Sequence, residues 1–119
     1  MKYPSERRHP RVSVAVPAEV KKPLEGYVRR AQTTNVSEGG CYIEMLYTLE
    51  PMTRLEVVLW LNGEKVKARA EVVTNQPSLG NGIRFIQISD KDKQKLKEFL
   101  EVAKKTRAFP FRTATSGQS

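Results

Sequence analysis

Apolar and polar residues alternate along the first part of this chain in a pattern that predicts β-strands. From Val12 to Val20 an apolar residue occupies every second position, which is the period of a strand that buries one face. Pro17 lies inside this run and predicts an edge or a bulge there. A weaker pattern predicts a second strand over about Tyr27 to Asn35, and Cys41 to Leu46 predicts a third.

The segment Arg54 to Leu61 is the most apolar of the chain and predicts a central strand, with Trp60 in the core. Asn62 and Gly63 follow it directly. They predict a type I′ hairpin, because both central residues of that turn need a positive φ. Beyond the hairpin, Val66 to Val72 alternates apolar with charged residues, so this strand is expected to expose one face to water.

A further extended run, Ile83 to Ile88, completes six predicted strands with no helix between them. This order favours a small antiparallel barrel over a doubly wound sheet. Ser89 and the acidic residues after it predict the start of a C-terminal helix. That helix has one apolar stripe, with which we expect it to cap the barrel or cover an edge, formed by Leu96, Phe99, Leu100 and Ala103.

The length of 119 residues suits one domain with its own core and is too short for two ordinary ones. We expect residues 12–105 to form this domain, with residues 1–11 as a flexible arm and residues 106–119 as a flexible tail. The predicted fold class is therefore all-β with one C-terminal α-helix.

Composition limits the chemistry that this domain can perform. The 21 basic and 13 acidic residues give a net charge of +8, which favours a phosphate-bearing or acidic partner. Cys41 is the only cysteine and His9 the only histidine. We therefore expect no disulfide, no metal, no cofactor and no enzyme activity. No apolar run approaches the roughly 20 residues of a membrane span, and we expect a cytoplasmic protein.

The stretch Glu6 to Arg11 places three arginines and a proline directly before the first predicted strand. A guanidinium can bind a phosphate or the O6/N7 edge of guanine with paired hydrogen bonds, and its flat face can stack on a base. Pro10 fixes its own φ and biases His9 toward extended backbone, so a shaped arm is expected and not a helix. The alternative is a solvated basic terminus without a ligand.

A second polar cluster extends from Asn35 to Gly40. Asn35 and Ser37 offer hydrogen-bonding groups, and the paired glycines Gly39 and Gly40 let a ligand approach the backbone closely. Taken alone, the segment predicts a turn that connects two strands.

Together the two clusters resemble the two-part motif of the PilZ domain family. One part stands before the first predicted strand and the other between the second and the third. The motif positions are Arg7, Arg11, Asn35, Ser37 and Gly40. Gly82 to Phe85 is also similar to the family's closing strand, and the resemblance covers about Ser5 to Lys105.

This resemblance implies a stand-alone PilZ-type barrel of six antiparallel strands that binds the bacterial second messenger cyclic di-GMP. It also implies a non-catalytic receptor or adaptor, whose arm changes conformation on binding and which signals to a downstream partner protein. The implied ligand-binding residues are Arg7, Arg8, Arg11, Asn35, Ser37, Gly39 and Gly40. Arg8 adds a guanidinium that the motif does not require. The family accepts Asp or Asn at position 35, and Asn presents one acceptor and one donor group to guanine.

Two other functions remain open from the residues alone. The fold can serve as a protein-interaction module that binds no nucleotide. Small basic barrels with exposed aromatic residues also bind single-stranded nucleic acid, and the candidates for stacking are Tyr27, Tyr42, Trp60 and Phe85. The basic residues of Val66 to Val72 alternate with alanine and valine, so we do not expect a nucleic-acid partner. The ligand stoichiometry, the oligomeric state and the regulated process (motility, pilus function, exopolysaccharide synthesis or transcription) stay undecided.

Overall fold

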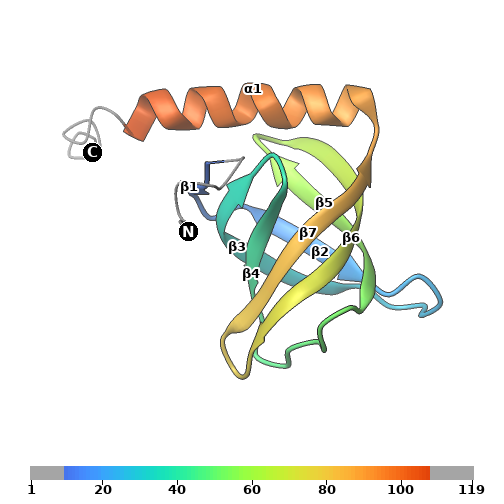
Figure 1. Ribbon diagram of the computed structural model, residues 1–119. Coiled ribbons are helices and arrows are strands. Elements are labelled where there is room, and N and C mark those ends of the chain that lie inside the picture. The colour runs from blue at the N-terminus through green and yellow to red at the C-terminus, as the bar shows by residue number, and fades with distance from the viewer. Residues whose placement is uncertain (1–9, 108–119) are drawn as a thin grey trace, which may run out of the picture.

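The computed structural model describes residues 10–107, which form a β-barrel and a helix (Figure 1). The strands are β1 (Val12–Ser13), β2 (Pro17–Lys21), β3 (Arg29–Ser37), β4 (Gly40–Glu44), β5 (Arg54–Leu61), β6 (Glu64–Gln76) and β7 (Gly80–Ile88). The helix α1 (Asp90–Arg107) follows them.

Six of these strands close into a barrel in which every pair is antiparallel. Their order is β3, β2, β5, β6, β7 and β4, and β4 pairs again with β3. The short β1 adds to β3 beside β2. Closure leaves no free edge along these pairings, which protects the backbone from pairing with another chain. The predicted six-stranded antiparallel barrel with one C-terminal helix is confirmed.

The first predicted strand is divided into β1 and β2 by the side chain of Thr33 on β3. The buried Thr33 hydroxyl accepts a hydrogen bond from the Val16 N–H at 3.0 Å and donates one to the Val14 carbonyl at 2.7 Å. These bonds replace part of the backbone ladder, so the strand bends with its polar groups satisfied. Pro17 begins β2 directly after this bend, in agreement with the predicted irregularity.

Strand β5 is central, between β2 and β6, and its odd-numbered residues from Leu55 to Leu61 fill the barrel. The prediction that Trp60 lies in the core is wrong. The strict alternation of β5 puts Trp60 on the outer face, where it is half-buried and the Lys65 ammonium lies 5.4 Å from the ring centroid. A cation over an aromatic face is favourable, so the outward position keeps a stabilising contact.

The hairpin and the helix start agree with their sequence signals. Asn62 and Gly63 have φ values of 53° and 85° between β5 and β6, as a type I′ turn requires. The Ser89 hydroxyl accepts the N–H of Asp92 at 3.1 Å and so caps α1. The Asp92 carboxylate also accepts the N–H of Lys67 on β6 at 3.1 Å, which ties the first turn of α1 to the barrel.

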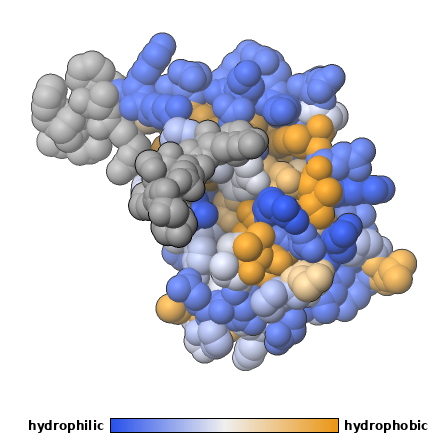
Figure 2. All heavy atoms as spheres, viewed as in Figure 1, coloured by the Kyte–Doolittle hydropathy of each residue, from blue (hydrophilic) through white to orange (hydrophobic). Residues whose placement is uncertain are grey.

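Helix α1 lies across one end of the barrel (Figure 1). Leu96 and Leu100 are buried, and Phe99 and Ala103 pack against the core, so the predicted apolar stripe docks as expected. Figure 2 shows hydrophilic residues along the outer side of α1 and apolar residues gathered on the strands below it. The helix extends to Arg107, slightly beyond the end at Lys105 expected from the sequence.

Replacing Asn81 by alanine is expected to lower the free energy of unfolding by about 2–4 kcal/mol. The buried Asn81 side chain donates to the carbonyls of Leu49 and Thr74 at 2.8 and 3.0 Å and accepts the Leu49 N–H at 2.8 Å. The truncation leaves these buried backbone groups unpaired. Urea denaturation followed by circular dichroism measures the loss, with Gln87→Ala, an exposed residue of the same strand, as control. Equal, small losses in both variants would contradict this account.

Candidate functional site

Strands β3, β4, β7 and β6 lie side by side and form one outer face of the barrel. Their register places four residues in a row across this face: Asn35 lies opposite Tyr42, Tyr42 opposite Gly82, and Gly82 opposite Thr74. Directly opposed residues project to the same side of a sheet, roughly 5 Å apart. Asn35 and Tyr42 are therefore neighbours on this face.

The turn between β3 and β4 is shorter than the sequence predicted. Asn35 and Ser37 belong to β3 and Gly40 to β4, so only Glu38 and Gly39 form the turn. The buried Ser37 hydroxyl accepts the Gly39 N–H at 3.1 Å and donates to the Gly40 carbonyl at 3.3 Å. Ser37 therefore fixes the geometry of the turn, in addition to any contact with a ligand.

At two positions on the outer face, glycines leave no side chain where the strands approach one another. A Cβ on Gly40 would collide with the Ile83 carbonyl oxygen of β7. A Cβ on Gly82 would lie 2.5 Å from the Thr74 Oγ1 atom of β6. Other residues at these two positions would require backbone or side-chain shifts, so the shape of this face depends on the glycines.

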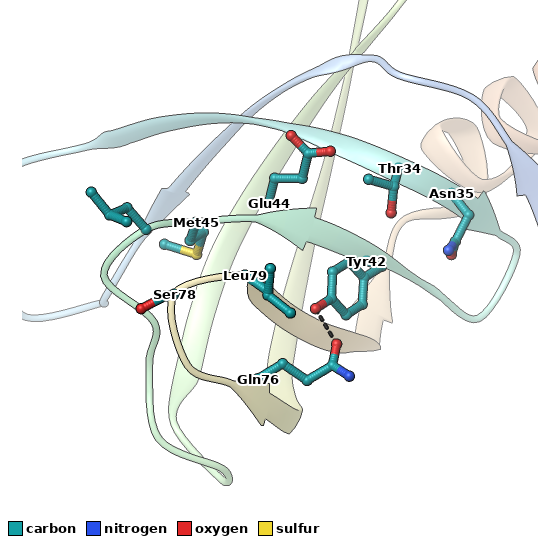
Figure 3. A pocket seen from close by; sticks show the side chains of 9 residues that line it. Thr34, Asn35, Tyr42, Glu44, Met45, Gln76, Ser78 and Leu79 are labelled. Atoms are coloured by element: carbon teal, nitrogen blue, oxygen red, sulfur yellow. Dashed lines mark hydrogen bonds between the residues drawn. The ribbon is translucent and has the colours of Figure 1, made fainter.

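Two hollows lie on this face. The first, of about 460 Å³, we call the arginine hollow; its lining includes Arg11, Ser37, Gly39, Gly40 and Arg84. The second, of about 760 Å³, we call the asparagine hollow (Figure 3); its lining includes Thr34, Asn35, Glu44, Ser78 and Leu79. Tyr42 and Gln76 line both hollows.

The arginine hollow carries positive charge from Arg11 and Arg84. Arg84 lies opposite Gly40 on one side and Glu71 on the other, and its Nη2 is 2.5 Å from Glu71 Oε1. The Arg54 Nε atom lies 3.8 Å from the other oxygen of Glu71. Arg84 is exposed, whereas the Glu71 side chain is only 14% exposed, so an anionic ligand that binds Arg84 would have to compete with this carboxylate.

Asn35 offers an acceptor without a partner. Its Oδ1 atom is buried and has no hydrogen-bond partner among the described residues. An unpaired buried acceptor costs roughly 1–3 kcal/mol. A donor on a ligand, such as the N1–H or N2–H of guanine, would remove this cost.

The structure thus brings four of the predicted residues, Arg11, Ser37, Gly39 and Gly40, into one hollow and Asn35 into the adjoining one. The predicted Arg7 and Arg8 lie outside the described residues. Sequence reasoning missed Arg84 as a site residue and considered Tyr42 only as a candidate for nucleic-acid binding. Alternation along β7 would have placed Arg84 outside, but only the barrel register brings it next to Gly40.

Reactive groups in this part of the chain are few. Within residues 10–107, no group of three or more His, Cys, Asp and Glu side chains is placed to hold a metal ion. Burial raises the pKa of Cys41 from 9.0 to about 12, and the charge of Arg11 acts weakly in the opposite direction. No helix among residues 10–107 is both long and apolar enough to cross a membrane.

Comparison with known families decides the classification. A family model described as the PilZ domain matches residues 5–102. The chain belongs to the PilZ domain family. Among curated proteins, no sequence matches it. The family assignment made from the two motifs is therefore confirmed.

Solved PilZ structures share the fold at low sequence identity. The inhibitor of motility MotI/DgrA of Bacillus subtilis has a TM-score of 0.72 and 18% identity over 94% of this chain and 56% of its own length. Escherichia coli YcgR in complex with cyclic di-GMP has a TM-score of 0.69 and 17% identity, over 90% of this chain and 51% of its own length. The PilZ domain of Escherichia coli YcgR with cyclic di-GMP has a TM-score of 0.70 and 13% identity, over 91% of this chain and 99% of its own length. This PilZ chain spans about half the length of MotI and of YcgR.

The Cys41 thiol is expected to resist alkylation in the folded protein. Near pH 9 the Cys41 thiol is half ionised in the unfolded chain, whereas burial keeps it neutral in the folded protein until the pH approaches about 12. The unfolded state then binds fewer protons, so stability should fall as the pH rises from 9 toward 12. Mass spectrometry after iodoacetamide treatment, with and without urea, measures the reactivity. Cys41→Ala is the control for the pH dependence, and equally fast labelling in both conditions would contradict the assignment.

Proposed function

We propose that this PilZ domain is a non-catalytic receptor for cyclic di-GMP. The observation that supports the proposal most strongly is the unpaired buried acceptor of Asn35 next to a hollow that contains Arg11, Ser37 and Gly40. These residues occupy the motif positions of a chain that belongs to the PilZ family. The PilZ domain of YcgR, which shares the fold, has been solved with cyclic di-GMP.

The two hollows suit the two kinds of group that cyclic di-GMP carries. Guanidinium groups at Arg11 and Arg84 can bind a phosphate or the Hoogsteen edge of a guanine. Asn35 Oδ1 can accept a hydrogen bond from the Watson–Crick edge. Gly39 and Gly40 leave the β3–β4 turn without a Cβ, so a ligand can approach its backbone.

The proposal includes a mode of signalling. Arg7 and Arg8 precede the described residues in sequence and would add two guanidinium groups when the N-terminal segment closes over the ligand. Ordering of a segment on binding is a common switch, because the ligand stabilises only the closed form. We propose that a partner protein reads this change.

Calorimetric titration should show micromolar or tighter binding of cyclic di-GMP and much weaker binding of cyclic di-AMP. Arg11→Ala and Asn35→Ala should each lower the affinity about tenfold or more, since each removes a hydrogen bond to a charged or desolvated group. Arg30→Ala is the matched control, because Arg30 is an exposed arginine of β3 outside both hollows. The absence of heat at millimolar ligand would overturn the proposal, and length-dependent, salt-sensitive binding of oligonucleotides would support the nucleic-acid alternative.

Tryptic cleavage after Arg7 and Arg8 should slow when cyclic di-GMP is bound, because closure of the N-terminal segment over the ligand makes these peptide bonds inaccessible to the protease. Cleavage after Lys65, which is exposed beside the β5–β6 hairpin and lines neither hollow, provides an internal control in the same digest. Time courses followed by mass spectrometry measure both rates. Equal cleavage of Arg7 and Arg8 with and without bound ligand would contradict closure of the segment while leaving ligand binding intact.

A further inference from the structure

The Tyr42 side chain lies across a neighbouring strand. Tyr42 belongs to β4, and the Tyr42 hydroxyl donates a hydrogen bond to Gln76 Oε1 at the end of β6 (Figure 3). Strand β7 runs between β4 and β6. A side chain that starts on β4 and bonds to β6 must therefore pass over β7.

Gly80 makes room for this position. It pairs with Glu44 of β4 on one side and with Gln76 of β6 on the other. A Cβ at Gly80 would collide with the Ile43 carbonyl oxygen of β4 and would also lie 2.7 Å from the Tyr42 Cε1 atom. The ring thus occupies the space that a side chain at Gly80 would fill. Tyr42 is half-buried and lines both hollows, so part of its side chain is open to this face.

Tyr42 lies where the two hollows meet. Asn35 lines the asparagine hollow, whereas Arg11 and Ser37 line the arginine hollow. Tyr42 and its hydrogen-bond partner Gln76 line both. A ligand that occupies both hollows would therefore lie against the tyrosine.

We propose that the outward side of the Tyr42 ring is a stacking platform for a guanine base of the bound ligand, and that Gln76 holds the ring in place. This inference rests on the proposed function, because it concerns the same cyclic dinucleotide. Purine bases stack on aromatic side chains, and such a contact strengthens binding roughly 5- to 150-fold. The hydrogen bond to Gln76 restricts the ring before binding, so less rotational freedom is lost on association.

The test compares Tyr42→Leu and Tyr42→Phe in calorimetric titrations with cyclic di-GMP. Tyr42→Leu removes the aromatic ring and should weaken binding by roughly 5- to 150-fold. Tyr42→Phe keeps the ring without the hydroxyl and should retain most of the affinity. Tyr47→Leu is the matched control, because Tyr47 is an exposed tyrosine just after β4 that lines neither hollow.

A spectroscopic readout separates stacking from a merely structural role. The near-ultraviolet circular dichroism of bound guanine should change between the wild-type complex and the Tyr42→Leu complex, and should be preserved in Tyr42→Phe. Thermal melting of the free variants shows whether each one folds. If Tyr42→Leu binds as tightly as the wild type with the same spectrum while Arg11→Ala loses binding, the platform is overturned and the receptor function stands. If the wild type itself does not bind, both proposals fail.

Discussion

The pairing of β4 with both β3 and β7 is the contact on which the rest of the structure depends, because it closes the barrel. Gly40 lies at this seam, opposite Ser37 on β3 and Arg84 on β7. A side chain at Gly40 would strike the β7 backbone, and the Ser37 hydroxyl holds the turn that brings the two strands together. The same residues line the arginine hollow. In this PilZ domain, the motif residues Ser37 and Gly40 are therefore structural as well as candidate ligand contacts.

Local patterns were sufficient for most elements of the fold. Alternation identified the strands, positive-φ residues identified the Asn62–Gly63 hairpin, and a capping serine identified the start of α1. Trp60 was misplaced because a very apolar strand does not reveal which of its faces is inside. The sequence indicated an irregularity at Pro17 but not the division of the strand, since the division depends on a hydrogen bond that the Thr33 hydroxyl accepts from the Val16 N–H, 17 positions away.

The candidate site was predicted only in part, for a related reason. Asn35, Ser37 and Gly40 lie close together in sequence and could be recognised as a cluster. Arg84 and Tyr42 join them only through the register of β7 and β4, and a register between distant strands is not encoded in the spacing of residues along the chain. Long-range pairing thus determines which side chains share the outer face.

A closed barrel restricts how binding at this face can be transmitted. The ladder hydrogen bonds run around the whole ring, and the core residues of β5 are almost fully buried, so the strands cannot separate without large cost. The groups that can respond lie at the surface, where the exposed Arg84 guanidinium contacts the largely buried side chain of Glu71. If a ligand draws Arg84 away, Glu71 keeps its ion pair with Arg54 but loses the one with Arg84. A response to a ligand on this face would therefore consist of rearranged surface charge, with the barrel as a rigid support.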